Sequence, residues 1–146
     1  MTPKIPQPPK KQYKTVKIPY FKNENFIFFK KIDYNIKNRY KKISYIYEKY
    51  DENGMFIQEF FHRKQKPAVI IYRQNFISEL QYWKNGKKHR EWGPAVILLN
   101  RKHEVISEKW FIDDKKLKDA DVDDKKLIIS RRKKMYKVIL KMFSNN

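Results

Sequence analysis

Aromatic and β-branched residues gather in short runs along the first part of the chain, with lysines between them. The runs at 26–29, 43–47 and 55–61 have the composition of β-strands. Asn53-Gly54 separates the second run from the third, and Asn-Gly supports positive φ at both central positions of a tight turn. We therefore expect strands at these three places and a hairpin that joins the last two.

An internal repeat occupies the middle of the chain. His62-Arg63, followed by Pro67-Ala68-Val69-Ile70, recurs as His89-Arg90, followed by Pro94-Ala95-Val96-Ile97, at one offset of 27 residues (89 − 62). Six identities in register indicate a repeated structural unit. The two prolines fit the start of a strand, where no ladder donor is needed.

A second element recurs beside the first. Residues 82–88 resemble residues 110–116 at an offset of 28. The difference of one residue between the two offsets is typical of a bulge or loop between copies. Each unit is then strand, turn, strand, turn, with strands at 95–99 and 104–111 joined by a turn at 100–103. These units predict an antiparallel meander.

The C-terminal segment has helical periodicity. Ile128, Met135, Ile139 and Met142 share one helical face, at steps of seven, four and three. Acidic residues come first and basic residues last, in accord with the helix dipole. We expect a helix from about 121 to 143, with its apolar face packed on the body as a cap for the last repeat and its other face basic.

The N-terminal segment differs from the rest in composition. Residues 1–20 contain five prolines and five lysines, and the first acid is Glu24. Proline excludes a helix or a central strand, so an extended cationic arm is predicted, with a disordered tail as the alternative. The predicted organisation is an arm at 1–20, a β-hairpin repeat domain at 21–118 and a capping helix with a tail at 119–146. The expected fold class is mainly β with a C-terminal helix, an antiparallel β-meander built from repeated hairpins with an extended N-terminal arm.

Charge narrows the class of partner. Lys and Arg number 35 against 16 Asp and Glu, which gives a net charge of +19. A polyanion relieves the self-repulsion of such a chain, so RNA, DNA, an acidic protein surface or an anionic membrane is an expected partner. A merely solubilising surface is the alternative. The candidate polyanion-binding residues are Lys4, Lys10, Lys11, Lys14, Lys17, Lys30, Lys31, Arg39, Lys41, Lys42, Arg131, Arg132, Lys133 and Lys134.

The chain offers little for catalysis. Cysteine is absent, which excludes disulfides and thiol chemistry and fits a reducing, intracellular compartment. Phosphate-binding glycine loops, a nucleophile elbow and a calcium loop are absent too. We therefore expect no enzyme activity, no cofactor, no metal and no small-molecule substrate. No apolar run is long enough for a transmembrane segment, and no signal peptide is predicted.

The repeated histidines admit two interpretations. His62 and His89 could be metal ligands or general bases, but a catalytic zinc site still needs three protein ligands. Their fixed offset favours a structural role, in which each imidazole hydrogen-bonds the backbone of the next hairpin while Arg63 and Arg90 bridge neighbouring strands. The residues expected to maintain the repeat are His62, Arg63, Pro67, Trp83, Asn85, Gly86, His89, Arg90, Gly93, Pro94 and Trp110.

The central copy resembles a known hairpin repeat. Its sequence from Trp83 to Ala95 is similar to Trp-x-x-Asn-Gly-Lys-x-His-Arg-x-x-Gly-Pro-Ala, a repeat of tailed phages and giant DNA viruses, and more distantly to MORN and YwqK-type repeats. The first copy departs from this pattern, with Lys66 where Gly93 stands in the second. The resemblance implies a β-meander with a binding or structural role.

These features predict a protein that binds rather than catalyses. We expect a structural or interaction component of a large assembly such as a virion, as a minor capsid or internal protein. A nucleic-acid-binding protein, including a ribonucleoprotein component, is the first alternative. A virus- or phage-encoded factor that binds a host protein is the second.

Overall fold

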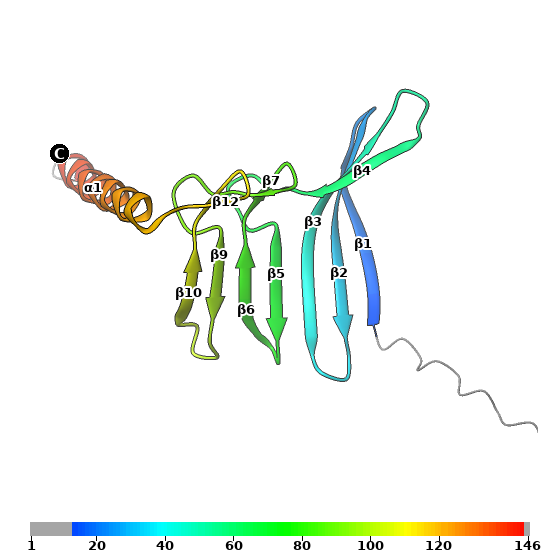
Figure 1. Ribbon diagram of the computed structural model, residues 1–146, viewed down its shortest axis with the longest axis horizontal. Helices are drawn as coiled ribbons and strands as arrows, with labels where there is room; N and C mark the ends of the chain where they lie inside the picture. Colours follow the sequence, from blue (N-terminus) through cyan, green and yellow to red (C-terminus); the bar gives the residue numbers. More distant parts are fainter. Residues whose placement is uncertain (1–12, 145–146) are drawn as a thin grey trace, which may run out of the picture.

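The structure, a computed structural model, describes residues 13–144. Its strands are β1 Tyr13–Lys22, β2 Phe26–Asn35, β3 Tyr40–Tyr50, β4 Phe56–Phe61, β5 Val69–Arg73, β6 Phe76–Gln81, β7 Trp83–Lys84, β8 Lys87–Lys88, β9 Val96–Leu99, β10 Val105–Lys109, β11 Phe111–Ile112 and β12 Lys115–Lys116. One helix, α1 Asp119–Ser144, follows them (Figure 1).

A single antiparallel sheet forms the body. Its strand order is β1-β2-β3-β5-β6-β9-β10, and β4 pairs with β3 beside this path. Two small hairpins, β7–β8 and β11–β12, lie along one end of the strands (Figure 1). The predicted fold class, mainly antiparallel β built from hairpins with a C-terminal helix, is confirmed.

The N-terminal part of the sheet extends further than the sequence suggested. The expected strands at 26–29, 43–47 and 55–61 are present within β2, β3 and β4. The expected boundary between residues 20 and 21 falls inside β1, which pairs with β2 along its length. Pro19 is accommodated because β1 is an edge strand, and the register shifts between Pro19 and Phe21. The predicted arm residues 1–12 lie outside the described residues.

The hairpins are connected in two ways, by tight two-residue turns or by a longer loop. Asn85-Gly86 has positive φ at both positions, 51° and 77°, as the Asn-Gly pattern predicts. Asp113-Asp114 keeps the same conformation at 48° and 66°, so the last copy preserves the turn without glycine. At Asn53-Gly54 only Gly54 has positive φ, and the prediction of two such residues was wrong there. The carboxylate of Asp51 accepts the backbone N–H groups of Asn53 and Met55, which builds a longer loop.

The core is thin because one sheet provides most of it. Equivalent positions of the two copies are buried in it: Ala68, Val69 and Ala95 are fully buried, and Val96 is 7% exposed. The other buried apolar residues are Phe29, Ile43, Tyr45, Ile46, Ile71 and Trp110. The repeat therefore supplies the central part of the core.

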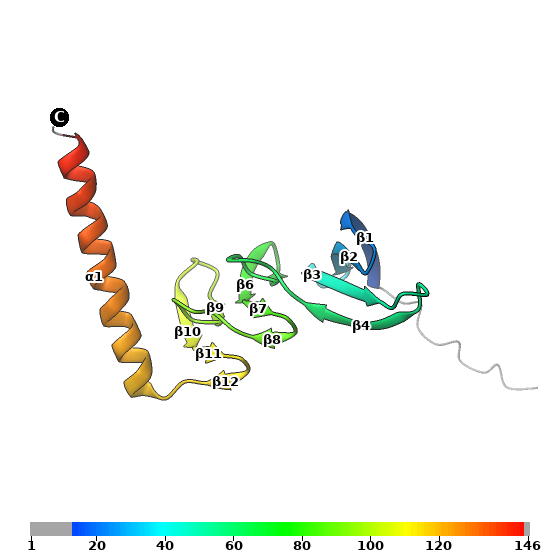
Figure 2. The same ribbon diagram turned by 90° about the horizontal axis from the view of Figure 1, so that it is seen from above.

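The helix forms where expected but does not cover the sheet. α1 includes the whole predicted range of 121–143, and it leaves the last hairpin at an angle to the row of strands (Figure 2). The expected packing of its apolar face was wrong, because Met135 and Met142 are 66% and 67% exposed and no residue of α1 is buried. The apolar periodicity shows which side chains of α1 share a face. Which face lies toward the sheet depends instead on the direction in which the chain leaves β12.

Candidate polyanion-binding groove

The two repeat histidines hold equivalent places. His62 Nδ1 accepts the backbone N–H of Asn85 at 3.0 Å, and His89 Nδ1 accepts that of Asp113 at 3.1 Å. Each imidazole thus fixes the turn of the next hairpin, through the hydrogen bond that the sequence predicted. A backbone bond supports each turn as well, from Gly86 N to the carbonyl oxygen of Phe61 and from Asp114 N to that of Lys88, both at 2.9 Å.

The repeat arginines are equivalent too. The guanidinium of Arg63 donates to the carbonyl oxygen of Pro67 at 3.1 Å, and that of Arg90 donates to Pro94 at 3.2 Å. The same groups lie over aromatic rings, Arg63 at 3.8 Å from the centroid of Tyr45 and Arg90 at 3.9 Å from that of Tyr82. Each arginine therefore links an aromatic residue that precedes its own hairpin, Tyr45 or Tyr82, to the proline segment that leads into the next strand.

Tyr45 begins a copy that the sequence comparison missed. His62 N donates to the carbonyl oxygen of Tyr45 at 3.1 Å, as His89 N does to Tyr82, and Leu117 N makes the matching bond to Trp110 at 2.9 Å. The first hairpin, β3–β4, is ten residues longer than β7–β8, since 17 positions separate Tyr45 from His62 and seven separate Tyr82 from His89. In the sequence, this copy could have been found from the aromatic residue that precedes each His-Arg pair by one hairpin, Tyr45 before His62 and Tyr82 before His89.

Two cavities meet at the central copy. The smaller, about 470 Å³, lies between the His-Arg loops of the two copies, and the larger, about 560 Å³, lies between the last copy and α1. Both are lined by Arg90 and Trp92, so they are neighbours on the surface, and we name the two together the basic groove. Its cations are Arg63, Lys64, Lys84, Arg90, Lys126, Lys133, Lys134 and Lys137, and its acids are Glu91 and Glu108.

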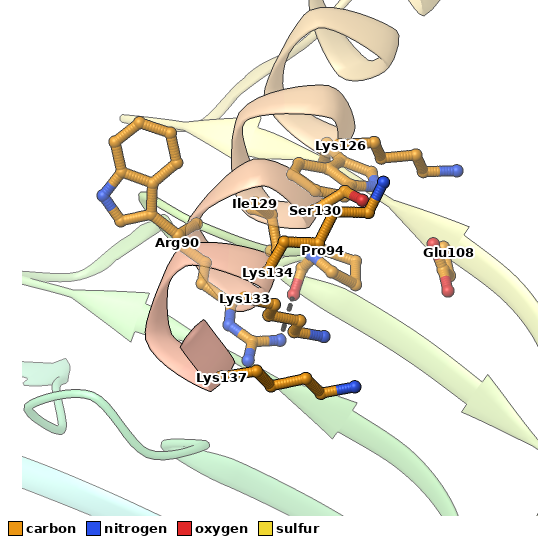
Figure 3. Close-up of a pocket in the computed structure, with 12 residues that line it drawn as sticks. Arg90, Pro94, Glu108, Lys126, Ile129, Ser130, Lys133, Lys134 and Lys137 are labelled. Carbon is orange, nitrogen blue, oxygen red and sulfur yellow. Dashed lines mark hydrogen bonds between the residues drawn. The ribbon is translucent and has the colours of Figure 1, made fainter. Parts of the chain in front are cut away.

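Helix α1 supplies four of these eight cations, and three of the four lie on one stripe. Lys126, Ser130, Lys133 and Lys137 follow at steps of four, three and four residues, which places them on one side of the helix. Figure 3 shows the lysine side chains of this stripe extending from α1 over the strands of the last copy. Within residues 13–144 these lysines make no ion pair or hydrogen bond, so their charges are available to a ligand.

Trp92 connects the helix to the repeat. The guanidinium carbon of Arg132 lies 4.0 Å from the centroid of its ring, and Lys125 Nζ lies 5.1 Å away. Lys125 also donates to the carbonyl oxygen of Glu91 at 2.7 Å and lies 3.8 Å from its carboxylate. These contacts hold the first half of α1 beside the groove while 39% of the Trp92 surface stays exposed.

The electrostatic surroundings of the two histidines differ. Burial lowers the pKa of His62 below its ordinary value, and the positive charge of Lys84 lowers this pKa further. His89 instead lies between two carboxylates, with Nδ1 3.3 Å from Asp113 and Nε2 3.7 Å from Glu91. Because Nδ1 of His89 accepts a backbone N–H, an ion pair there requires protonation of the ring and loss of that bond.

In the described part of the chain no three His, Asp or Glu side chains are grouped closely enough to hold a metal.

The candidate cations of the N-terminal strands lie elsewhere. They are at the end of the sheet away from α1 (Figure 1). Lys17 is 3.3 Å from the Glu48 carboxylate, and Lys41 lies over the ring of Tyr72 at 4.3 Å. Lys4, Lys10 and Lys11 are outside the described residues. The described candidates away from the groove are Lys14, Lys17, Lys30, Lys31, Arg39, Lys41 and Lys42.

The groove contains part of the predicted set and adds to it. Lys133 and Lys134 line it directly, whereas Arg132 contacts it through Trp92. The residues of this surface that were not predicted include four lysines and a tryptophan, which belong to separate elements that only the fold brings together. These residues are Lys64, Lys84, Trp92, Lys126 and Lys137.

Comparisons with known proteins found no match for this chain. No protein-family model, no curated protein and no solved structure matches it. Between residues 13 and 144, no helix is both long enough and apolar enough to cross a bilayer.

Proposed function

We propose that this chain is a non-enzymatic, basic component of a larger assembly, and that it binds nucleic acid through the basic groove. The supporting observation is the excess of positive charge in the groove, where eight cations from three parts of the fold line two neighbouring cavities that contain only two acids. A phosphate backbone would neutralise these charges and release counterions, which is the main source of affinity for nucleic acids.

The chemistry of the repeat supports binding over catalysis. His62 and His89 both accept backbone N–H groups at Nδ1, so that nitrogen is occupied in maintaining the hairpins. The guanidinium of Arg90 is similarly held between Tyr82 and the carbonyl of Pro94. The groove also presents lysines and the exposed ring of Trp92, a combination typical of nucleic-acid surfaces.

Charge reversal in the groove tests this function. The variant carries Lys126→Glu, Lys133→Glu and Lys137→Glu. Its matched control carries Lys14→Glu and Lys22→Glu in β1 and Lys37→Glu in the β2–β3 turn, all at exposed positions away from the groove. We expect the groove variant to lose at least about tenfold in affinity for a fluorescent RNA oligonucleotide at low salt, and the control to lose much less. Equal losses would show that net charge alone binds the nucleic acid and would contradict the proposal.

A structural role based on protein contacts is the second candidate. It is favoured by the exposed apolar side chains in the last part of α1, such as Met135, Leu140 and Phe143, since contiguous exposed apolar surface commonly marks a protein interface. A high-salt wash separates the two functions, because salt weakens phosphate contacts and leaves apolar contacts intact. Retention on assemblies after the wash would favour the structural role, and release would favour nucleic-acid binding.

A further inference from the structure

We propose that the ligand of the basic groove is single-stranded nucleic acid, with one unpaired base in the smaller cavity and the adjoining phosphates along the lysine stripe of α1. This inference rests on the proposed function and deepens it. It assigns different tasks to the two cavities, the smaller to a base and the larger to the backbone.

The smaller cavity has the composition of a base site. Aromatic rings of Tyr82, Trp83 and Trp92 line it, together with the cations Arg63, Lys84 and Arg90. Its volume of about 470 Å³ lies within the range of small-ligand sites, about 300–1,000 Å³. Every base offers a π-face, so stacking on such rings is tolerant of sequence.

The aromatic walls are held in place before any ligand arrives. Trp83 packs edge-to-face on Phe61 with centroids 5.2 Å apart, and its Nε1 donates to Gln81 Oε1 at 2.9 Å. Trp92 is held by the cations of α1, with Arg132 at 4.0 Å from its ring. Since rings that are already ordered lose little entropy on binding, this arrangement favours stacking of a base.

The path of the strand follows from the residues that the cavities share. Trp92 and Arg90 border both cavities, so a chain that leaves the base site meets α1 next. The lysine stripe from Lys126 to Lys137 extends about 16 Å along the helix at 1.5 Å per residue. The strand can therefore have one base beside Trp92 and several phosphates beside the lysines.

A single strand fits this arrangement better than a duplex. In a duplex the faces of the bases are stacked on one another and are unavailable to a protein ring. A groove that used only its lysines would bind both forms through their phosphates. The presence of aromatic walls beside the cations therefore points to unpaired bases.

Matched oligonucleotides test the inference. The full-length protein is titrated at about 50 mM salt with a fluorescent DNA single strand and with the duplex of the same sequence. We expect tighter binding of the single strand, accompanied by quenching of tryptophan fluorescence. Trp92→Ala should weaken binding of the single strand about tenfold, as expected for loss of one stacked base, and should change duplex affinity less than twofold.

Two further variants keep this test decisive if Trp92→Ala perturbs α1. Trp92→Phe retains a ring and should bind the single strand nearly as well as the wild type. Lys84→Ala lies in the smaller cavity away from the helix and should weaken single-strand binding with the helical circular dichroism unchanged.

The outcomes separate the two proposals. Equal affinities for single strand and duplex, unaffected by Trp92→Ala but lost on reversal of Lys126, Lys133 and Lys137, would overturn the base site and leave nucleic-acid binding intact. No binding of either form at low salt, or tighter binding of poly-glutamate than of either, would overturn both.

Discussion

The imidazole of His62 lies 3.0 Å from the backbone nitrogen of Asn85, and it can accept that N–H only through an unprotonated Nδ1. Burial and the charge of Lys84 favour the same neutral form, because both lower the pKa of His62 in the folded protein. The first copy of the repeat is therefore joined to the next hairpin by a bond that depends on pH.

This bond predicts a pH dependence of stability. The folded pKa of His62 is below that of the unfolded chain, so as the pH falls the unfolded chain takes up the proton first, near pH 6.5. The contribution of His62 to the free energy of unfolding should be complete above that pH and should decline from there down to the folded pKa. Urea unfolding at a series of pH values measures it. His62→Gln should flatten the profile, whereas His103→Gln, in an exposed turn, should leave it unchanged; equal profiles for the wild type and His62→Gln would refute the assignment.

The contact between Gly93 and Arg90 gives a second prediction. A Cβ on Gly93 would lie 2.7 Å from the guanidinium carbon of Arg90, which is held by Tyr82 and by the carbonyl of Pro94. Gly93→Ala should displace this guanidinium and lower the free energy of unfolding by about 1 kcal/mol. The effect should depend on Arg90.

A double-mutant cycle checks that dependence. In an Arg90→Ala background the added methyl group no longer meets a guanidinium, so Gly93→Ala should cost much less there. The first copy has Lys66 at the equivalent position, and its backbone differs there, because Gln65 before it has a φ of 59° whereas Trp92 before Gly93 has no positive φ. Strict additivity of the two substitutions would show that the contact has no energetic role.

Removal of α1 gives a third prediction. No residue of the helix is buried, so a chain that ends at Lys118 should keep the β-sheet signal and should lose about 1 kcal/mol of stability or less. The same truncation should reduce nucleic-acid affinity strongly, because it removes half of the cations of the groove. Chemical unfolding and oligonucleotide titration measure the two effects. Loss of cooperative unfolding in the truncated chain would instead show that the helix caps the repeat.

The repeat was predictable because it is local. Six identities at an offset of 27 placed His62 and His89 in equivalent hairpins, and the structure has both histidines in the same hydrogen bond. The copy at Tyr45 escaped detection because an insertion in the β3–β4 hairpin breaks the offset. This copy is equivalent to the others in its backbone hydrogen bonds, and these do not require identical residues.

The orientation of the helix and the groove were not predictable. The apolar periodicity from Ile128 to Met142 correctly indicated a helix, but the direction in which α1 leaves the last hairpin turns Lys126 and Lys133 toward the body. Lys64 and Lys137 are far apart in the sequence, and the fold places them in neighbouring cavities that share Arg90 and Trp92. Such a site depends on tertiary geometry.

Photo-crosslinking tests the central claim most directly. A single-stranded oligonucleotide is irradiated with the full-length protein, and the attached peptides are located by mass spectrometry. The account predicts crosslinks at Trp83 and Trp92 and within the α1 peptide that contains Lys133. Crosslinks confined to β1, β2 and β3, with none in the groove, would contradict it.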